Sequence, residues 1–242
     1  MVQSSILGRL LYTFDRAAWV GTDALVAEMP KEQLPSNGGY VVEVSGPSTL
    51  KVTFYRGASG DAQSFFVADV SGGKVVRTER LPKPIALSAM QNILVRAREA
   101  ALAAAGELSF RPCTAAPFNT VVLPPRDYSP VAVYLLTAQL DTKSYPVGGH
   151  YRILVRLDGG VAASRTYSKA CLNMALPKPT TKSKSVSLFV SHLLDPAPTE
   201  IHVFVSMQLR MPIFVGTTAA GTKAMRLWAV QGGKISPIGV NK

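Results

Sequence analysis

The sequence predicts an α+β protein with antiparallel-rich sheets and one long amphipathic helix at about residues 88–105. Two observations lead to this prediction. Short runs of β-branched and aromatic residues recur between glycine, proline and serine, which is typical of antiparallel strands. One segment instead spaces its apolar residues three and four positions apart behind a capping sequence, as a helix does. We expect an N-terminal β-rich region over residues 1–84 and an α+β domain over residues 85–242, or one continuous unit.

The N-terminal region is expected to begin with a short helix between Ile6 and Trp19 and to continue as a small antiparallel sheet. Its strands are predicted by four runs, at residues 40–45, 50–55, 64–70 and 74–80. In the second run Leu50 alternates with polar neighbours, so one face of the sheet should be buried. Pro82 and Pro84 are expected to end the last strand.

The helix at residues 88–105 carries the clearest local signals. Ser88, with Gln91 three residues later, fits a capping box. Gly106 stands where the glycine that follows a helix is expected. The apolar face of the helix is formed by Met90, Ile93, Leu94, Ala97 and Ala101. We expect Arg96, Arg98 and Glu99 to lie on its solvent side.

The second part of the chain contains further strand-like runs, at residues 131–137, 151–157, 161–168, 185–192, 213–217 and 226–230. The segment 199–209 fits two structures. Its alternating β-branched residues favour a strand, whereas Thr199 before Glu200 is typical of a helix N-cap. The sequence leaves helix and strand open for this segment.

The net charge of +11 is unevenly distributed. Residues 1–110 contain 11 Lys/Arg and 10 Asp/Glu, whereas residues 111–242 contain 15 and 5, so the second part carries +10 of the total. Such an excess favours an acidic protein or another anionic partner, although a solvated basic surface has the same composition. The candidate anion- or partner-binding residues are Lys178, Lys182, Lys184, Arg152 and Arg156.

Nucleic acid is a less favoured anionic partner. In the strand at residues 151–157, Arg152 and Arg156 lie on the opposite face from Tyr151. A base-stacking platform instead combines aromatic rings and cations on one face.

Three features bear on the compartment. Cys113 and Cys171 are the only cysteines, and they are compatible with one disulfide or with two free thiols. No apolar run approaches the roughly 18 residues of a membrane helix. Arg9 interrupts the N-terminal apolar stretch and no small-residue cleavage site follows, so no signal peptide is expected. The expected location is the cytoplasm or periplasm of a bacterium.

The stretch SHLLDPAPTEIHVF (191–204) holds two of the three histidines together with an aspartate and a glutamate. A catalytic zinc commonly takes three His, Asp or Glu ligands and keeps one position open. The candidate metal ligands are His192, His202, His150 and Asp195. The alternative is a corner in which His192 donates a hydrogen bond to Asp195. We expect no cofactor, with zinc as the alternative.

The order of helix, strands, FVSHLLDPAPTEIHVF, MPIFVGTTAAG and RLWAVQGGKI resembles a degenerate JAMM/MPN-type metallopeptidase domain over about residues 85–240. In that family two histidines separated by one residue end a strand, a Ser-x-x-Asp motif follows on a helix, and an upstream glutamate activates zinc-bound water. The resemblance assigns these roles to His192 as the second histidine, Val190 at the position of the first, Thr199 near the serine, His202 near the aspartate, and Glu99 or Glu107 as the glutamate.

Three functions follow as hypotheses. The first is a non-catalytic interaction or scaffold protein with a basic C-terminal face, because every catalytic motif in the chain lacks at least one part. The second is a zinc-dependent JAMM-like hydrolase or peptidase. The third is binding of nucleic acid or another polyanion, whose affinity would fall steeply with salt.

Overall fold

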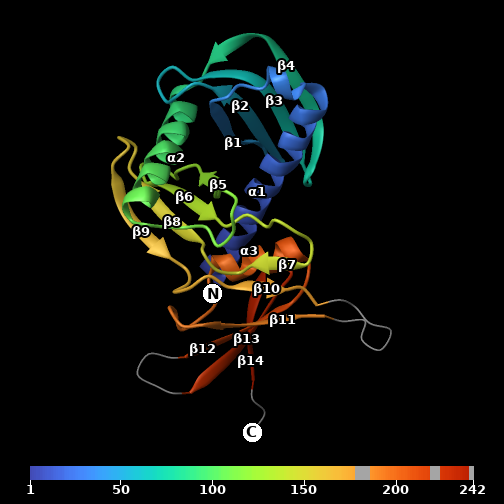
Figure 1. Cartoon of the computed structure of the whole chain (residues 1–242), viewed down its shortest axis with the longest axis vertical. Coiled ribbons are helices and arrows are strands. Elements are labelled where there is room, and N and C mark those ends of the chain that lie inside the picture. Colours follow the sequence, from blue (N-terminus) through green and yellow to red (C-terminus); the bar gives the residue numbers. More distant parts are fainter. Residues whose placement is uncertain (178–185, 219–223, 240–242) are drawn as a thin grey trace.

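The computed structural model describes residues 1–177, 186–218 and 224–239 of the chain. Its described part contains α-helices and mostly antiparallel sheets, which confirms the predicted α+β class. Figure 1 shows a sheet at each end of the molecule, a third sheet between them, and one long helix that runs from one end toward the other.

The N-terminal sheet is an antiparallel meander, and the four predicted strands are confirmed. Adjacent strands pair in the order of the chain, and the turn between the third and fourth uses Gly72 and Gly73 at positive φ, which glycine adopts without steric penalty. The strands are β1 (Gly38–Gly46), β2 (Thr49–Arg56), β3 (Gln63–Ser71) and β4 (Lys74–Ala86).

The prediction that Pro82 and Pro84 end the fourth strand is wrong, because β4 continues to Ala86. Ser64 pairs with Ile85 while Phe66 pairs with Arg80, so the prolines lie in a bulge where the ladder is interrupted. β4 is also an edge strand. Proline is tolerated at edges and bulges because no backbone N–H is needed there.

The first helix, α1 (Val2–Glu28), is much longer than the expected segment. Its buried face continues past Trp19 through Gly21 and Leu25, so packing extends the helix beyond the short apolar run read from the sequence. A Cβ on Gly8 would lie 2.4 Å from Val203 Cβ of α3 (Glu200–Leu209), and one on Gly21 would lie 3.3 Å from Val52 of β2. The two glycines therefore allow α1 to pack closely against both ends of the molecule.

The second helix, α2 (Ala89–Glu107), begins as predicted. Ser88 Oγ accepts a hydrogen bond from the Gln91 backbone N–H at 3.1 Å, and Gln91 Oε1 accepts one from the Ser88 N–H at 3.0 Å, which confirms the capping box. The prediction that Gly106 follows the helix is wrong, because the helix includes Gly106. The chain turns instead at Ser109, with φ of 57°.

Of the three charged residues of α2 that were expected on its solvent side, Arg96 is exposed, whereas Arg98 and Glu99 are half-buried. Arg98 Nε donates to Thr120 Oγ1 at 3.0 Å, and Glu99 accepts a hydrogen bond from Ser59 Oγ at 2.6 Å. α2 therefore links the N-terminal sheet to the middle sheet. The middle sheet consists of β5 (Asn119–Leu123), β6 (Val131–Leu136), β8 (Tyr151–Val155) and β9 (Val161–Thr166).

A two-stranded ribbon of β7 (Ser144–Pro146) and β10 (Asn173–Ala175) connects the middle sheet to the C-terminal part. A disulfide joins Cys113 to Cys171 beside it. A Cβ on Gly149 would lie 2.4 Å from Cys113 Sγ, and Gly149 also has φ of 71°. Glycine at this position therefore accommodates both the turn and the sulfur.

The C-terminal sheet has the order β11-β12-β13-β14. β11 pairs parallel with β12, and α3 is the crossover between them, as a parallel connection requires. Segment 199–209 is thus a helix, and because residues on all its sides are buried, its strand-like alternation carries no information about its surroundings. The strands are β11 (Leu188–His192), β12 (Ile213–Thr218), β13 (Met225–Gln231) and β14 (Lys234–Ile238).

Two buried apolar clusters hold these elements together. One combines Phe14 and Phe66 with Val203 and Trp228, and the other combines Tyr55 with residues of α2 and the middle sheet. Both clusters contain residues from before and after position 84. Of the described helices, none combines the length and apolar character that a membrane span requires.

Candidate functional site

A cluster of polar side chains lies where β11 turns into α3. His192 is the last residue of β11 and faces the interior, and its Nε2 is 2.8 Å from Asp195 Oδ2. Arg165 of β9 donates to both Asp195 oxygens at 2.7 Å. The Arg165 guanidinium also lies 4.7 Å from the centroid of the Tyr167 ring. Asp195 is therefore held between a histidine of its own corner and an arginine of the middle sheet.

His202 belongs to the same cluster and also to the start of α3. Its Nδ1 accepts a hydrogen bond from the Thr199 backbone N–H at 3.0 Å, so it fills the place of the acidic or amide residue in a capping box. Its ring centroid is 4.6 Å from that of His192. Burial, followed by the neighbouring His192, lowers the pKa of His202 to about 3. His202 is therefore neutral in the folded protein at physiological pH.

Glu200, the first residue of α3, is 4% exposed and has three partners. Its Oε1 accepts hydrogen bonds from the hydroxyl groups of Tyr134, at 3.1 Å, and Tyr167. Arg152 Nη1 lies 3.2 Å from the same oxygen. Burial raises the pKa of Tyr134 to about 12, with the Glu200 charge as the next cause, and raises that of Tyr167 further. The two phenols therefore remain hydrogen-bond donors to a buried carboxylate.

The predicted metal ligands separate into two places. His192, Asp195 and His202 meet at the β11–α3 corner, whereas His150 precedes β8. His150 Nδ1 accepts from the Thr137 N–H at 3.2 Å and its Nε2 lies 3.0 Å from the Pro146 carbonyl oxygen, and burial lowers its pKa to about 4.

The corner does not fit a zinc ion as it is arranged. Arg165 occupies both oxygens of Asp195, and Thr199 occupies His202 Nδ1. Within the described ranges, no group of three His, Cys, Asp or Glu side chains is placed to hold a metal. A zinc ion would have to displace Arg165 to gain the carboxylate as a ligand.

Of the predicted anion-binding residues, the structure describes Arg152 and Arg156, and each is engaged within the chain. Arg152 is engaged by Glu200. Arg156 folds over its own turn, where Nη1 donates to the Val161 carbonyl oxygen at 3.1 Å and Nε lies 3.5 Å from Asp158 Oδ1. Lys178, Lys182 and Lys184 lie outside the described residues.

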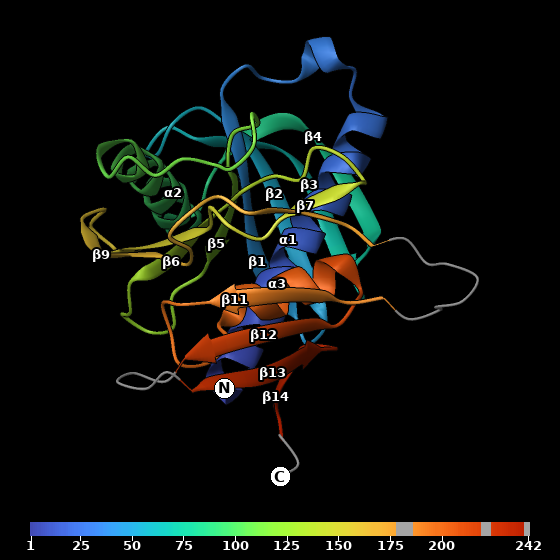
Figure 2. The ribbon, with the colours of Figure 1, turned by 60° about the horizontal axis from the view of Figure 1, so that its bottom comes forward.

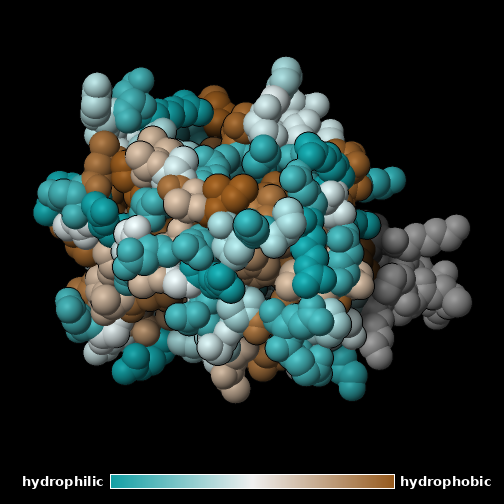
Figure 3. Space-filling view, turned by 90° about the horizontal axis from the view of Figure 1, so that it is seen from above, coloured by the Kyte–Doolittle hydropathy of each residue, from teal (hydrophilic) through white to brown (hydrophobic). Residues whose placement is uncertain are grey.

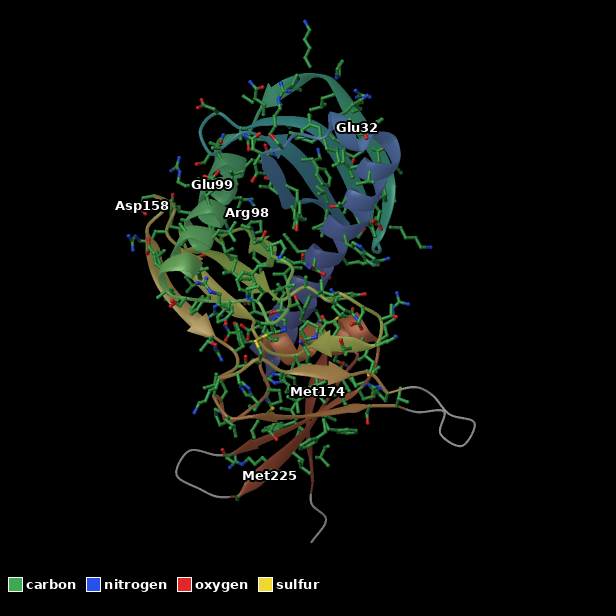
Figure 4. All side chains as sticks on the ribbon, in the orientation of Figure 1. Glu32, Arg98, Glu99, Asp158, Met174 and Met225 are labelled. Carbon is green, nitrogen blue, oxygen red and sulfur yellow. A yellow bond between two sulfur atoms is a disulfide. The ribbon has the colours of Figure 1, made fainter. Side chains whose placement is uncertain are left out.

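The positions suggested by the family resemblance are also dispersed. Val190, at the place of the first histidine, is a buried apolar residue of β11. Glu99 lies on α2 beside the N-terminal sheet (Figure 4). It accepts hydrogen bonds from Ser59 there and is not part of the β11–α3 corner. Glu107 is exposed at the end of the same helix.

The sequence did not single out an apolar surface on the C-terminal sheet. We define the outer face as the side of the sheet that points away from α3, with the apolar residues Phe189, Phe214, Met225, Leu227 and Ile238. Figure 2 brings this sheet forward, with α1 and α3 behind it. No described element covers the outer face. Seen from the opposite end of the molecule, hydrophilic side chains predominate (Figure 3).

Large side chains meet on this outer face while staying exposed. Phe189 and Met225 are 49% and 60% exposed. A Cβ on Gly216 would lie 3.1 Å from Phe189 Cζ and 3.4 Å from Met225 Sδ, so both side chains lie over this glycine. A sequence signal for this surface exists, because β12 and β13 carry apolar residues at both alternating sets of positions. The same pattern also predicts the strands themselves.

Among its described residues, the outer face carries positive charge without a carboxylate of its own. No acidic residue follows Glu200 in the sequence, whereas Arg210, Arg226 and Lys234 do follow it and are exposed. Lys234 lies on the outer face itself, opposite Gln231 in the strand register, whereas Arg226 belongs to the alternating set of Trp228 and Val230 on the other face of the sheet. The two acidic residues of the β11–α3 corner, Asp195 and Glu200, are neutralised by arginines of the middle sheet. The positive charge near the outer face is therefore not balanced by carboxylates within the C-terminal sheet.

The chain matches no protein-family model, and no curated protein or solved structure is similar to it at the level of a match. The JAMM/MPN-type resemblance therefore stays a prediction.

Proposed function

We propose that this chain is an interaction protein that binds an acidic protein partner on the outer face of the C-terminal sheet. The observation that carries the proposal is an exposed apolar surface with uncompensated positive charge beside it. Contiguous apolar patches of this kind mark contact sites, and protein interfaces commonly combine an apolar centre rich in Phe and Met with a polar rim.

The apolar centre favours a protein over a simple polyanion. A polyanion is bound by cations that neutralise its phosphates or sulfates, and it gains little from exposed Phe189 and Met225. An acidic protein can cover the apolar residues and pair with Lys234 at the same time.

The polar cluster supports a non-catalytic role. Each of its carboxylates is held by an arginine and by further hydrogen bonds, so both act as links between the C-terminal part and the middle sheet. A group that acts in catalysis must instead be able to exchange its partner for a substrate or a proton.

The disulfide favours the periplasm over the cytoplasm as the place of this interaction. Disulfides persist in oxidising compartments and are kept reduced in most bacterial cytoplasms. Cys113 and Cys171 are bonded to each other in the structure.

The proposal can be tested by replacing both components of the surface. Proteins retained by the immobilised full chain would be quantified by mass spectrometry for the wild type, Phe189→Ser and Lys234→Glu. Lys74→Glu, at the exposed first residue of β4, is the matched charge-reversal control. We expect one acidic protein to be lost from both outer-face variants and kept by the control. An identical set of retained proteins for all four chains would contradict the proposal.

A zinc-dependent hydrolase remains the second candidate, because His192, Asp195 and His202 lie together at the end of a strand. Its test is the metal content of protein purified without added metal or a polyhistidine tag, measured by elemental mass spectrometry. About one zinc per chain, lost in His192→Ala and in His202→Ala, would support it. Protein that contains no zinc would remove this candidate.

Polyanion binding is the third candidate. It predicts retardation of DNA or RNA at low salt and a steep loss of affinity as salt rises. Failure of the chain to retard either nucleic acid at low salt would remove it.

A further inference from the structure

A second candidate site, which shares no residue with the outer face, is a cleft between α1, α3, β1 and the edge of the middle sheet. Its volume is about 480 Å³, within the roughly 300–1,000 Å³ of small-molecule sites. Residues from four separate parts of the chain line it, so the cleft exists only in the folded protein.

Aromatic side chains form much of the wall of this cleft. Trp19 is 58% exposed at its rim, while Tyr145 and Phe204 are buried and Tyr40 is half-buried. The faces of such rings attract cations as well as apolar groups. The Arg16 guanidinium, which lies 4.4 Å from the Trp19 ring centroid without lining the cleft, demonstrates this attraction at the rim.

One carboxylate faces this aromatic cleft. Asp15 Oδ2 accepts a hydrogen bond from the Gln208 side-chain amide of α3. The ion pairs found among the described residues do not include Asp15. The Asp15 charge also contributes to the raised pKa values of Tyr40 and Tyr145, so its field reaches both phenols. A carboxylate with an amide partner instead of a cation retains most of its attraction for a positive ligand.

We infer that this cleft binds a small organic cation whose ammonium group pairs with the Asp15 carboxylate and whose apolar body lies against the aromatic wall. The carboxylate supplies the charge, the tyrosine and tryptophan rings supply cation–π attraction, and Phe204 supplies apolar contact. This site is independent of the proposed partner surface, since the two share no residue.

Affinity should depend on pH through Asp15. Burial raises its pKa to about 6, while the Gln208 hydrogen bond and the Arg16 charge oppose that rise. The other titratable groups near it are Tyr40 and Tyr145, which remain neutral up to high pH. A cationic ligand requires the ionised carboxylate, so its affinity should fall about tenfold between pH 7.5 and pH 5.

The test is a calorimetric titration of the full chain with benzylammonium chloride, with benzyl alcohol as the neutral ligand of matched shape. The titration is made in about 0.15 M salt, where the Debye length of roughly 8 Å screens the net charge of +11. We expect benzylammonium to bind with a Kd of about 1 mM or tighter, and benzyl alcohol to bind at least tenfold more weakly. Quenching of Trp19 fluorescence gives a second readout.

Two variants on α1 make the result specific. Asp15→Asn keeps a side chain that can hydrogen bond to Gln208 and removes the charge, so benzylammonium affinity should fall at least tenfold. Asp23→Asn removes an exposed carboxylate from the same helix and should leave the affinity unchanged. Thermal unfolding of each variant checks that the fold is kept. Equal binding of benzylammonium and benzyl alcohol, no binding of either, or undiminished binding by Asp15→Asn would overturn the inference.

Discussion

Glu200 and Asp15 are both carboxylates on helices that pack in the interior, but their surroundings differ. Glu200 has an arginine and two phenol donors, which join α3 to the middle sheet. Asp15 has an amide donor and faces a cleft. The first carboxylate is bound entirely by its own chain, whereas the second retains capacity for an external partner.

The difference separates structural from functional acids. A buried charge stabilises a fold only when its partners offset the loss of hydration. Glu200 meets this condition, whereas the raised pKa of Asp15 shows that its ionised form is disfavoured in the folded protein. An ionisable group that is kept at some loss of stability is a candidate for function.

The largest expected effect comes from Glu200→Ala. It leaves the half-buried Arg152 without its carboxylate and removes the acceptor of Tyr134 and Tyr167. We expect the free energy of unfolding in urea to fall by about 3–5 kcal/mol. The matched control is Glu107→Ala at the exposed end of α2, which should change it by less than about 0.5 kcal/mol. A loss below about 1 kcal/mol for Glu200→Ala would mean that Glu200 is no structural link.

The next effect concerns His202 and appears at acid pH. The pKa of His202 is about 3 in the folded protein and 6.5 in the unfolded chain, so the unfolded state binds the extra proton between these values. His202 therefore contributes stability that is present above pH 6.5 and is lost by about 1.4 kcal/mol per pH unit below it. His150, with a pKa of about 4, adds to the same loss.

His202→Asn tests this contribution, because an asparagine oxygen can still accept the Thr199 N–H. Between pH 6.5 and pH 5 the variant should lose about 2 kcal/mol less unfolding free energy than the wild type. Urea titrations at the two pH values measure the difference. Parallel losses for the two chains would show that His202 does not titrate differently on folding.

Asp15→Asn should act with the opposite sign. The pKa of Asp15 is about 6 in the folded protein and 3.8 in the unfolded chain, so the folded state binds the extra proton between these values and stability falls as pH rises through them. After allowance for solvent at the cleft, the free energy of unfolding of the variant should be about 1–2 kcal/mol higher than that of the wild type at pH 8 and equal to it at pH 3.5. Urea unfolding at both pH values measures this, and a variant less stable than the wild type at pH 8 would place Asp15 with Glu200 as a structural acid.

Local signals in the sequence predicted much of the fold but only part of the sites. The capping box of Ser88 and the alternating strands depend on neighbours within a few residues, and so does the His192–Asp195 contact. The bulge in β4 and the length of α1 depend on tertiary pairing and packing, which no local pattern encodes. Segment 199–209 carries both helix and strand signals. Because α3 is buried on all sides, the alternation of its apolar residues does not indicate which face is buried.

The partners of the two carboxylates could not be predicted for the same reason. Glu200 binds Tyr134, which is 66 residues away, and Asp15 binds Gln208, which is 193 residues away. The outer face likewise requires the strand order, since Phe189 and Met225 meet only across β12. Sequence spacing identifies chemistry within one element, whereas these sites are assembled from several.

The smallest expected effect is that of Arg16→Gln. This variant compares Glu200, a carboxylate paired with an arginine, with Asp15, a carboxylate that only lies near one. The Arg16 charge lowers the pKa of Asp15, but less than burial raises it. Removal of the Arg16 charge should move the pKa of Asp15 above 6 and change the unfolding free energy at neutral pH by less than about 0.5 kcal/mol, because solvent screens the charge of a half-buried side chain. The carboxyl carbon resonance of Asp15, followed by NMR against pH, measures the shift, with Arg77→Gln on β4 as the control. A fall in the pKa of Asp15 would mean that Arg16 does not act on Asp15 through its charge.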